Sequence, residues 1–150
     1  MMEWEQCLAD AGCRITASRR AVMCVLQEAC APLLPQEILG QGQRIHQKLG
    51  LVTVYRTLAL LTELDLVRRV HRENGCHGYV LASPGHRHTL ICEGCNRAAE
   101  FPGEDEIRAL IQRVEVATGY RVNDHLLQLF GLCPACQERE SPALHVERRT

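Results

Sequence analysis

The sequence has no long hydrophobic run. Its longest apolar stretches are LALL (58–61) and HLLQLFGLC (125–133), and both are far shorter than the roughly 20 residues of a membrane-spanning helix. The first ten residues, MMEWEQCLAD, lack the basic start and apolar stretch of a secretion signal. We therefore expect a cytoplasmic protein that makes no membrane contact.

The chain also lacks a large excess of one charge. A formal net charge of −1 excludes the simplest argument for nucleic-acid binding, which needs a strongly basic protein. The charge is unevenly distributed, however: nine basic and four acidic residues lie between positions 14 and 72, and the rest of the chain is acidic. A locally positive N-terminal half could bind phosphates, although a solvated helical surface explains the same pattern.

Helical spacing of apolar residues dominates the first 65 positions. It predicts a short helix over 4–11, followed by helices that begin near Thr16 or Ser18, at Pro35 and at Thr53. Proline suits the first turn of a helix because that position needs no amide donor.

A hairpin is predicted after these helices, over 66–82. Its turn signal is Asn74-Gly75, and a two-residue turn there pairs Arg72 with His77 and His71 with Gly78. Helices followed by such a wing have the order of a winged helix-turn-helix, in which the helix before the wing enters the DNA major groove. A small helical domain with an incidental hairpin is the alternative.

A second unit follows the Pro/Gly joint ASPG (82–85). Its pattern predicts a strand over 86–92, a helix over 104–118, and strands over 120–123 and 125–132. Small units of this kind often pair across two-fold axes. We therefore expect an α+β fold made of a winged-helix domain (1–82), a hinge (83–85), a small C-terminal α/β metal-binding dimerisation domain (86–137) and a flexible tail (138–150).

The nine cysteines include two Cys-x-x-Cys pairs, Cys92/Cys95 and Cys133/Cys136. Two such pairs supply the four thiolates of a tetrahedral structural zinc site, which would pin the first strand of the second unit to the chain after its last strand. Redox-active pairs or free thiols are the alternatives. A thioredoxin-like pair should start a helix in a βαβ setting, and neither pair is predicted to do so.

Histidines gather near the expected joint. In the predicted register His71 and Cys76 share a face of the wing, and His86 and His88 share a face of the following strand because they are two residues apart. Together they predict a second, exchangeable metal site that would tie the wing to the second unit. A ligand set of thiolate and imidazole favours zinc over iron or manganese. The alternative is that these are ordinary surface histidines and that Cys76 has no role in metal binding.

Several motifs, in this order, resemble those of the ferric-uptake-regulator (Fur) family of bacterial metal-responsive repressors: PQEIL, TVYRTLALLTELDLV, HRHTLICEGC, EF (100–101) and HLLQLFGLCPAC. The resemblance covers about residues 12–137. It implies a homodimer that binds palindromic double-stranded operator DNA, a dimer contact in the C-terminal domain, and a structural zinc on the four paired cysteines.

The resemblance also implies binding sites for the sensed metal, but this sequence departs from the family pattern at several of their ligand positions. Leu33 or Leu34, Val80 and Thr89 stand where iron- and peroxide-sensing members have ligands. What remains is similar to the zinc-uptake-regulator type, with the candidate regulatory ligands His71, Cys76, His86, His88 and Glu100. A further family site matches His86, His88 and His125. Its carboxylate falls in GEDE (103–106), where Glu104, Asp105 and Glu106 are the alternatives and Glu106 is the one we assign.

The same resemblance assigns the DNA contacts. Tyr55 and Arg56 match the family's DNA-contacting helix. We expect phosphate contacts from Arg14, Arg19, Arg20 and Arg56, with Thr53 and Tyr55 near bases or backbone.

These features together predict a zinc-responsive dimeric repressor of metal-uptake genes, with one structural and one or more regulatory zinc ions per subunit and no small organic substrate. A Fur-family sensor of iron, manganese, haem or peroxide is the nearest alternative. A zinc hydrolase or deaminase is remote: HRE (71–73) precedes CEGC, but Ile91 replaces the proline that the deaminase pattern needs. A metal buffer or scaffold would not need the Tyr55-Arg56 helix and wing.

Overall fold

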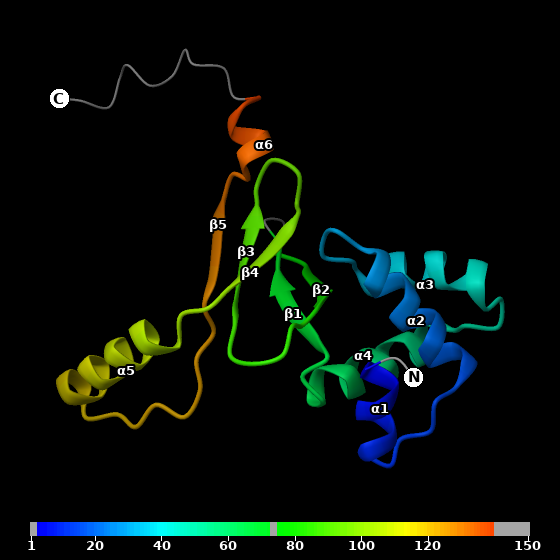
Figure 1. The fold of residues 1–150 in the computed structure, drawn as a ribbon, viewed down its shortest axis with the longest axis horizontal. Coiled ribbons are helices and arrows are strands. Elements are labelled where there is room, and N and C mark those ends of the chain that lie inside the picture. Colours follow the sequence, from blue (N-terminus) through cyan, green and yellow to red (C-terminus); the bar gives the residue numbers. More distant parts are fainter. Residues whose placement is uncertain (1–2, 73–74, 140–150) are drawn as a thin grey trace.

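A computed structural model describes residues 3–72 and 75–139. It shows a helical N-terminal part with a two-stranded wing, followed by a three-stranded sheet that carries a projecting helix (Figure 1). Within these ranges no helix combines the length and the apolarity needed to cross a membrane. Asn74, His145 and nearly all of the predicted tail lie outside the described residues.

The elements, in chain order, are α1 (Glu3–Asp10), α2 (Ala17–Glu28), α3 (Pro35–Ile45), α4 (Leu51–Glu63), β1 (Val67–His71), β2 (His77–Leu81), β3 (His88–Cys92), β4 (Ala98–Phe101), α5 (Glu104–Thr118), β5 (Gln128–Gly131) and α6 (Pro134–Gln137).

The helical part has a single apolar core, to which α1, α2, α3 and α4 all contribute. Thr16 caps α2, as predicted, because its side-chain oxygen accepts a hydrogen bond from the backbone N–H of Arg19. The predicted start of α3 at Pro35 is also confirmed. The core side chains that are fully enclosed include Leu8, Val22, Leu26, Ile38, Leu58 and Leu61.

The predicted start of α4 at Thr53 is wrong. Gly50 is extended and forms the cap, and its carbonyl accepts from the backbone N–H of Val54, so the helix begins at Leu51. Thr53 therefore lies inside the first turn. Thr53 does not act as the cap because Gly50, three positions earlier, is the last extended residue before the helix.

The predicted pairing in the wing is wrong by one residue. The strands β1 and β2 place His71 opposite His77 and Val70 opposite Gly78. Gly75 is left-handed and donates to the carbonyl of Arg72. This pattern is typical of a longer hairpin loop with a glycine bulge, which adds a residue to the connection.

The C-terminal sheet has the order β4-β3-β5. Its central strand β3 is antiparallel to β4 and parallel to β5. The helix α5 matches the predicted 104–118, whereas β4 and α6 were not predicted. The predicted strand over 120–123 is absent, because the backbone N–H of Val122 donates to Glu115 of α5 instead of to a neighbouring strand.

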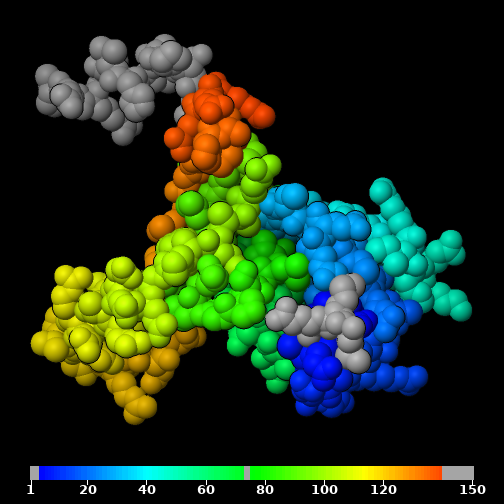
Figure 2. Space-filling view, in the orientation of Figure 1, coloured from blue at the N-terminus to red at the C-terminus, as the bar shows by residue number. Residues whose placement is uncertain are grey.

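The wing packs directly on this sheet. Val70 and Val80 of the wing form a small buried cluster with Ile91 of β3. In contrast, α5 has no buried residue and projects from the body as a separate lobe, while α6 stands at the opposite end of the sheet (Figure 2). The sheet therefore connects the winged helix, α5 and the end that carries the cysteine pairs.

Candidate metal centres and nucleic-acid face

The four paired cysteines meet at one end of the C-terminal sheet. Cys92 ends β3, and the parallel pairing with β5 places it opposite Gly131, just before Cys133. The four sulfur atoms of Cys92, Cys95, Cys133 and Cys136 all lie within 4.8 Å of one another. The fold thus brings together the two pairs that are far apart in the sequence.

Backbone groups shape this cysteine cluster. Asn96 is left-handed and its N–H donates to the carbonyl of Cys92, so the chain turns tightly after β3. A Cβ atom added at Gly94 would lie 2.9 Å from Sγ of Cys136, so a larger residue there would displace that sulfur. The N–H of Cys133 donates to Sγ of Cys92 over 3.2 Å. Such N–H···S bonds favour a thiolate at that position.

The two buried thiols, Cys92 and Cys136, have different pKa values because their surroundings differ. The backbone N–H of Cys133 is the main reason that the pKa of Cys92 falls to about 6. The neighbouring sulfur of Cys133, together with burial, raises the pKa of Cys136 to about 12. Four thiolates this close together need a cation to offset their repulsion, and zinc bound to thiols keeps them deprotonated. The cluster therefore fits a four-thiolate metal site.

The expectation that neither pair starts a helix is wrong for Cys133, which caps α6. This helix is a single turn, and within the described residues no strand follows it. A redox site would in addition need two thiols set apart from other sulfur ligands. The gathering of both pairs into one cluster favours metal binding over that alternative.

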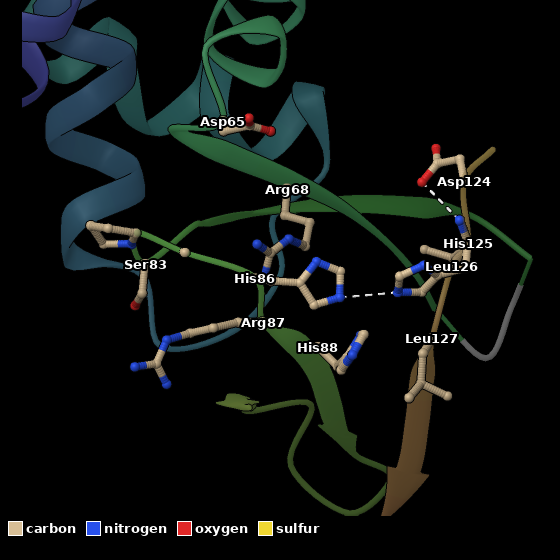
Figure 3. Close-up of a pocket in the computed structure, with 12 residues that line it drawn as sticks. Asp65, Arg68, Ser83, His86, Arg87, His88, Asp124, His125, Leu126 and Leu127 are labelled. Atoms are coloured by element: carbon tan, nitrogen blue, oxygen red, sulfur yellow. Dashed lines mark hydrogen bonds between the residues drawn. The ribbon is translucent and has the colours of Figure 1, made fainter. Parts of the chain in front are cut away.

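Three histidines form a second cluster beside the hinge. His88 begins β3, His86 precedes it, and His125 comes from the segment before β5 (Figure 3). Their ligand nitrogens lie within 4.8 Å of one another, and Nε2 of His86 is 3.0 Å from Nε2 of His125. His88 is only 4% exposed, and its Nε2 has no hydrogen-bond partner among the described residues. An unpartnered buried nitrogen facing two other imidazoles fits a bound cation.

Electrostatics favour neutral histidines in this cluster. Burial is the main cause that lowers the pKa of His88 below 6.5, and the adjacent His86, His125 and Arg68 lower it further. Neutral imidazole is the form that binds metal. The three rings line a cavity of about 420 Å³ at the hinge, which leaves space for further ligands.

The predicted carboxylates, Glu100 and Glu106, do not lie in the histidine cluster. Among the described residues Glu106 is an exposed residue of α5 and is not part of the group. Glu100 lies in β4, where it accepts hydrogen bonds from Arg68 and from the backbone of Ser83. Sequence reasoning missed this ion pair because no spacing rule links Arg68 to Glu100.

His71 and Cys76 also lie outside both clusters, as far as the described residues go. The register places His71 beside His77, with ring centroids 4.5 Å apart, instead of beside Cys76. Cys76 lines a groove between the wing and the start of α3, together with Tyr55 of α4. The expected meeting of His71, Cys76 and Glu100 with His86 and His88 does not occur.

The predicted DNA-contacting residues come from α4, from the first turn of α2 and from the segment that enters α2. Tyr55 is 46% exposed and Arg56 is exposed, whereas Thr53 is half-buried. Arg14 and Arg20 are exposed as well, but Arg20 forms an ion pair with Glu5 over 3.0 Å. The half-buried Arg19 donates to the backbone carbonyl of Arg14. Arg14, Arg20 and Arg56 thus present positive charge to solvent.

Known proteins resemble the chain over almost its full length. The sequence profile of the ferric uptake regulator family matches residues 10–130. The ferric uptake regulation protein of Vibrio anguillarum is 32% identical over 152 residues, covering 99% of this chain and 100% of that protein. That of Legionella pneumophila is also 32% identical, over 91% of this chain and 100% of that protein.

Solved structures agree with this. The Vibrio cholerae ferric uptake regulator has a TM-score of 0.60 at 29% identity, covering 87% of this chain and 100% of that chain. A zinc uptake regulator complexed with zinc and DNA has a TM-score of 0.78 at 24% identity, covering 92% and 93%, which shows a shared fold. With its winged helix and α+β sheet, the chain thus belongs to the ferric uptake regulator family of metal-responsive transcription regulators, which are not enzymes.

Proposed function

We propose that this chain is a homodimeric repressor that binds palindromic operator DNA of metal-uptake genes in response to zinc. The observation that carries the proposal is the direct packing of a DNA-binding wing on a sheet that bears two separate clusters of metal-ligating side chains. We place the winged-helix domain at 1–82, the hinge at 83–85 and the metal-binding dimerisation domain at 86–137.

The two clusters suit different roles. Cys92, Cys95, Cys133 and Cys136 supply a complete tetrahedral ligand set, which is typical of a closed structural zinc site. His86, His88 and His125 supply three ligands beside the hinge and leave a position open, which suits an exchangeable ion. When bound there, zinc would supply a dication that holds the segment before β3 to the segment before β5.

The DNA-binding proposal is supported by the exposed start of α4. In a winged helix-turn-helix this helix lies in the major groove, so Tyr55 and Thr53 would face bases or backbone. Arg14, Arg19, Arg20 and Arg56 would lie near phosphates. A zinc uptake regulator of the same fold, at 24% identity, was solved in complex with zinc and DNA, which supports a DNA-binding role for this fold.

The homodimer is supported by the exposed apolar side chains of the C-terminal domain. No residue of α5 is buried, although Leu110 and Val114 lie four residues apart on one helical face. Leu129 and Phe130 of β5 are also about half exposed. An apolar stripe on a helix that has no fully buried residue favours burial against a second copy.

Iron sensing is the second candidate, because the most similar relatives reported above are named ferric uptake regulation proteins. Three imidazoles can bind iron as well as zinc. The absence of a carboxylate from the histidine cluster, among the described residues, favours zinc.

Operator binding measured at controlled free metal tests both candidates. A zinc-responsive repressor binds a palindromic operator more tightly with zinc than with a strong chelator, and iron(II) or manganese(II) has a smaller effect at matched free concentration. Replacement of Arg56 by Ala should weaken binding to all sequences and reduce the slope of log affinity against log salt by about 1. Equal affinity with zinc and with chelator would refute the zinc switch.

A further inference from the structure

We infer that Arg68 takes the place of a metal ion at Glu100. The two side chains form, with the hinge residue Ser83, a clasp made only of protein groups. This clasp holds the wing on the C-terminal sheet in the metal-free chain. Its consequence for DNA binding rests on the proposed function, but its existence and its effect on metal binding do not.

The clasp joins three parts of the chain. Arg68 belongs to β1 of the wing, Glu100 belongs to β4 of the sheet, and Ser83 lies in the hinge between them. Nη1 of Arg68 donates to Oε1 of Glu100 over 2.8 Å. The backbone N–H of Ser83 donates to the same carboxylate, at 3.1 Å from Oε2 and 3.3 Å from Oε1. Both carboxylate oxygens therefore already have donors.

Burial makes this ion pair stronger than an ordinary surface pair. The side chains of Arg68 and Glu100 are 26% and 15% exposed. Both lie beside Val80, which pairs with Arg68 in the wing and belongs to the small apolar cluster with Val70 and Ile91. A charge-assisted pair in such a place is less screened than the exposed pairs that contribute little to stability.

Among the described residues, Glu100 is in neither group of side chains that could hold a metal ion, although Cys30 lines the same cavity. Thr89 lies opposite Glu100 in the sheet and has only a hydroxyl, and Val80 belongs to the apolar cluster. Arginine cannot lose its proton in a protein. Its guanidinium therefore supplies, at every physiological pH, the positive charge that a bound cation would otherwise supply to this carboxylate.

The clasp also adjoins the histidine cluster. Arg68 lines the same cavity as His86, His88 and His125, and it points toward His86 in Figure 3. A guanidinium that lines the same cavity repels a dication bound to the imidazoles unless its charge is offset by Glu100. Loss of Glu100 and loss of Arg68 should therefore have opposite effects on zinc affinity, although both break the clasp.

The test compares Glu100→Gln and Arg68→Ala with the wild-type full chain, and uses Arg108→Ala as the matched control. Arg108 forms an ion pair of the same length, 2.8 Å, with Glu104 on the surface of α5 and takes no part in the clasp. Arg68→Lys keeps the charge and should give an intermediate result. The readouts are hydrogen exchange of the hinge amides in metal-free protein, zinc per subunit, zinc affinity, and operator affinity in chelator.

We expect the Ser83 amide to exchange roughly three- to ten-fold faster in Glu100→Gln and Arg68→Ala, and the metal-free operator affinity to fall by a similar factor. Zinc per subunit should stay unchanged in both. Zinc affinity should fall in Glu100→Gln, and should stay the same or rise in Arg68→Ala. The control should match the wild type in every readout.

Loss of one zinc per subunit in Glu100→Gln would show that Glu100 is a metal ligand and would overturn the clasp. Unchanged exchange of Ser83 in both variants would overturn it as well. If wild-type protein binds no operator DNA with any metal, the proposed function fails. The exchange and zinc measurements still decide the clasp in that case.

Discussion

The Nε2 atoms of His86 and His125 lie 3.0 Å apart, although 38 residues separate them along the chain. The parallel pairing of β3 with β5 creates this proximity, because the segments that enter both strands start from the same end of the sheet. His88 completes the group from the first position of β3. Metal binding at these three rings would therefore act directly on the segment that joins the hinge to the sheet.

Replacement of His125 by Ala should remove the exchangeable zinc and keep the structural one. Two imidazoles remain in the cluster, and two ligands bind zinc far more weakly than three, whereas the cysteine cluster is untouched. Elemental analysis after mild and strong chelation measures both sites. His46→Ala is the matched control, since His46 follows α3 in the helical part, and it should keep the wild-type zinc content. Loss of all zinc in His125→Ala would contradict two independent sites.

The stability of the metal-free protein should fall as the pH drops below about 6.5. The pKa of His88 is lowered in the fold, mainly by burial, so between that pKa and 6.5 the unfolded chain binds more protons than the folded chain. Unfolding free energy then rises with pH across this window. Urea titrations from pH 7.5 to 5 measure the effect. His88→Phe, which removes the titrating ring, should show a shallower pH dependence, and an identical slope would contradict the assignment.

Cys92 should react with iodoacetamide faster than Cys136 in metal-stripped protein at pH 7. The pKa of Cys92 is about 6 and that of Cys136 is about 12, and only the thiolate reacts. Both residues are similarly buried, so access does not explain a difference. Mass spectrometry of peptides after a short pulse gives the two rates. Zinc should protect both cysteines, and equal rates without zinc would contradict the predicted acidities.

Gln128 should stabilise the wing against the sheet. Its amide accepts from the backbone N–H of His71 over 2.8 Å and donates to the backbone carbonyl of His71 over 2.7 Å. Gln128→Ala removes both bonds, which should lower the unfolding free energy by about 1–2 kcal/mol and speed hydrogen exchange at the His71 amide. Gln43→Ala is the control, because Gln43 bonds the carbonyl of Leu49 within the helical part. It should leave exchange at His71 unchanged.

Negative charge on the apolar stripe of α5 should break the homodimer. In Leu110→Glu/Val114→Glu, two exposed apolar side chains become charged without loss of a buried core residue. Sedimentation should show monomers at micromolar concentration. Gln112→Glu adds charge on another face of the same helix and should remain dimeric. A double variant that is still dimeric would place the interface elsewhere.

Local signals predicted much of the fold. Thr16 and Pro35 mark the starts of α2 and α3 because capping oxygens and proline act within one turn of a helix. The range 104–118 spans about four helical turns, so the spacing of its apolar residues identifies a helix, and α5 occupies this range. The family resemblance depended on the motif order, which survives at 32% identity.

Contacts set by long-range geometry could not be predicted. The wing register depended on one extra residue in the loop, which moved His71 from Gly78 to His77. The strand β4 is four residues long and lacks a clear alternating pattern, so only its pairing with β3 defines it. The ion pair of Arg68 with Glu100 likewise follows from how the wing packs on the sheet. The sequence contains no local sign of that packing.

The most direct test of the account is a titration of operator affinity against buffered free zinc, with bound zinc counted at each point. We predict that protein holding only the structural zinc binds the palindromic operator weakly. Filling of a second site should then raise affinity by at least about ten-fold, equivalent to a coupling free energy of about 1.4 kcal/mol, and His125→Ala should lose this increase. Operator affinity that stays constant while the second site fills would contradict the central claim.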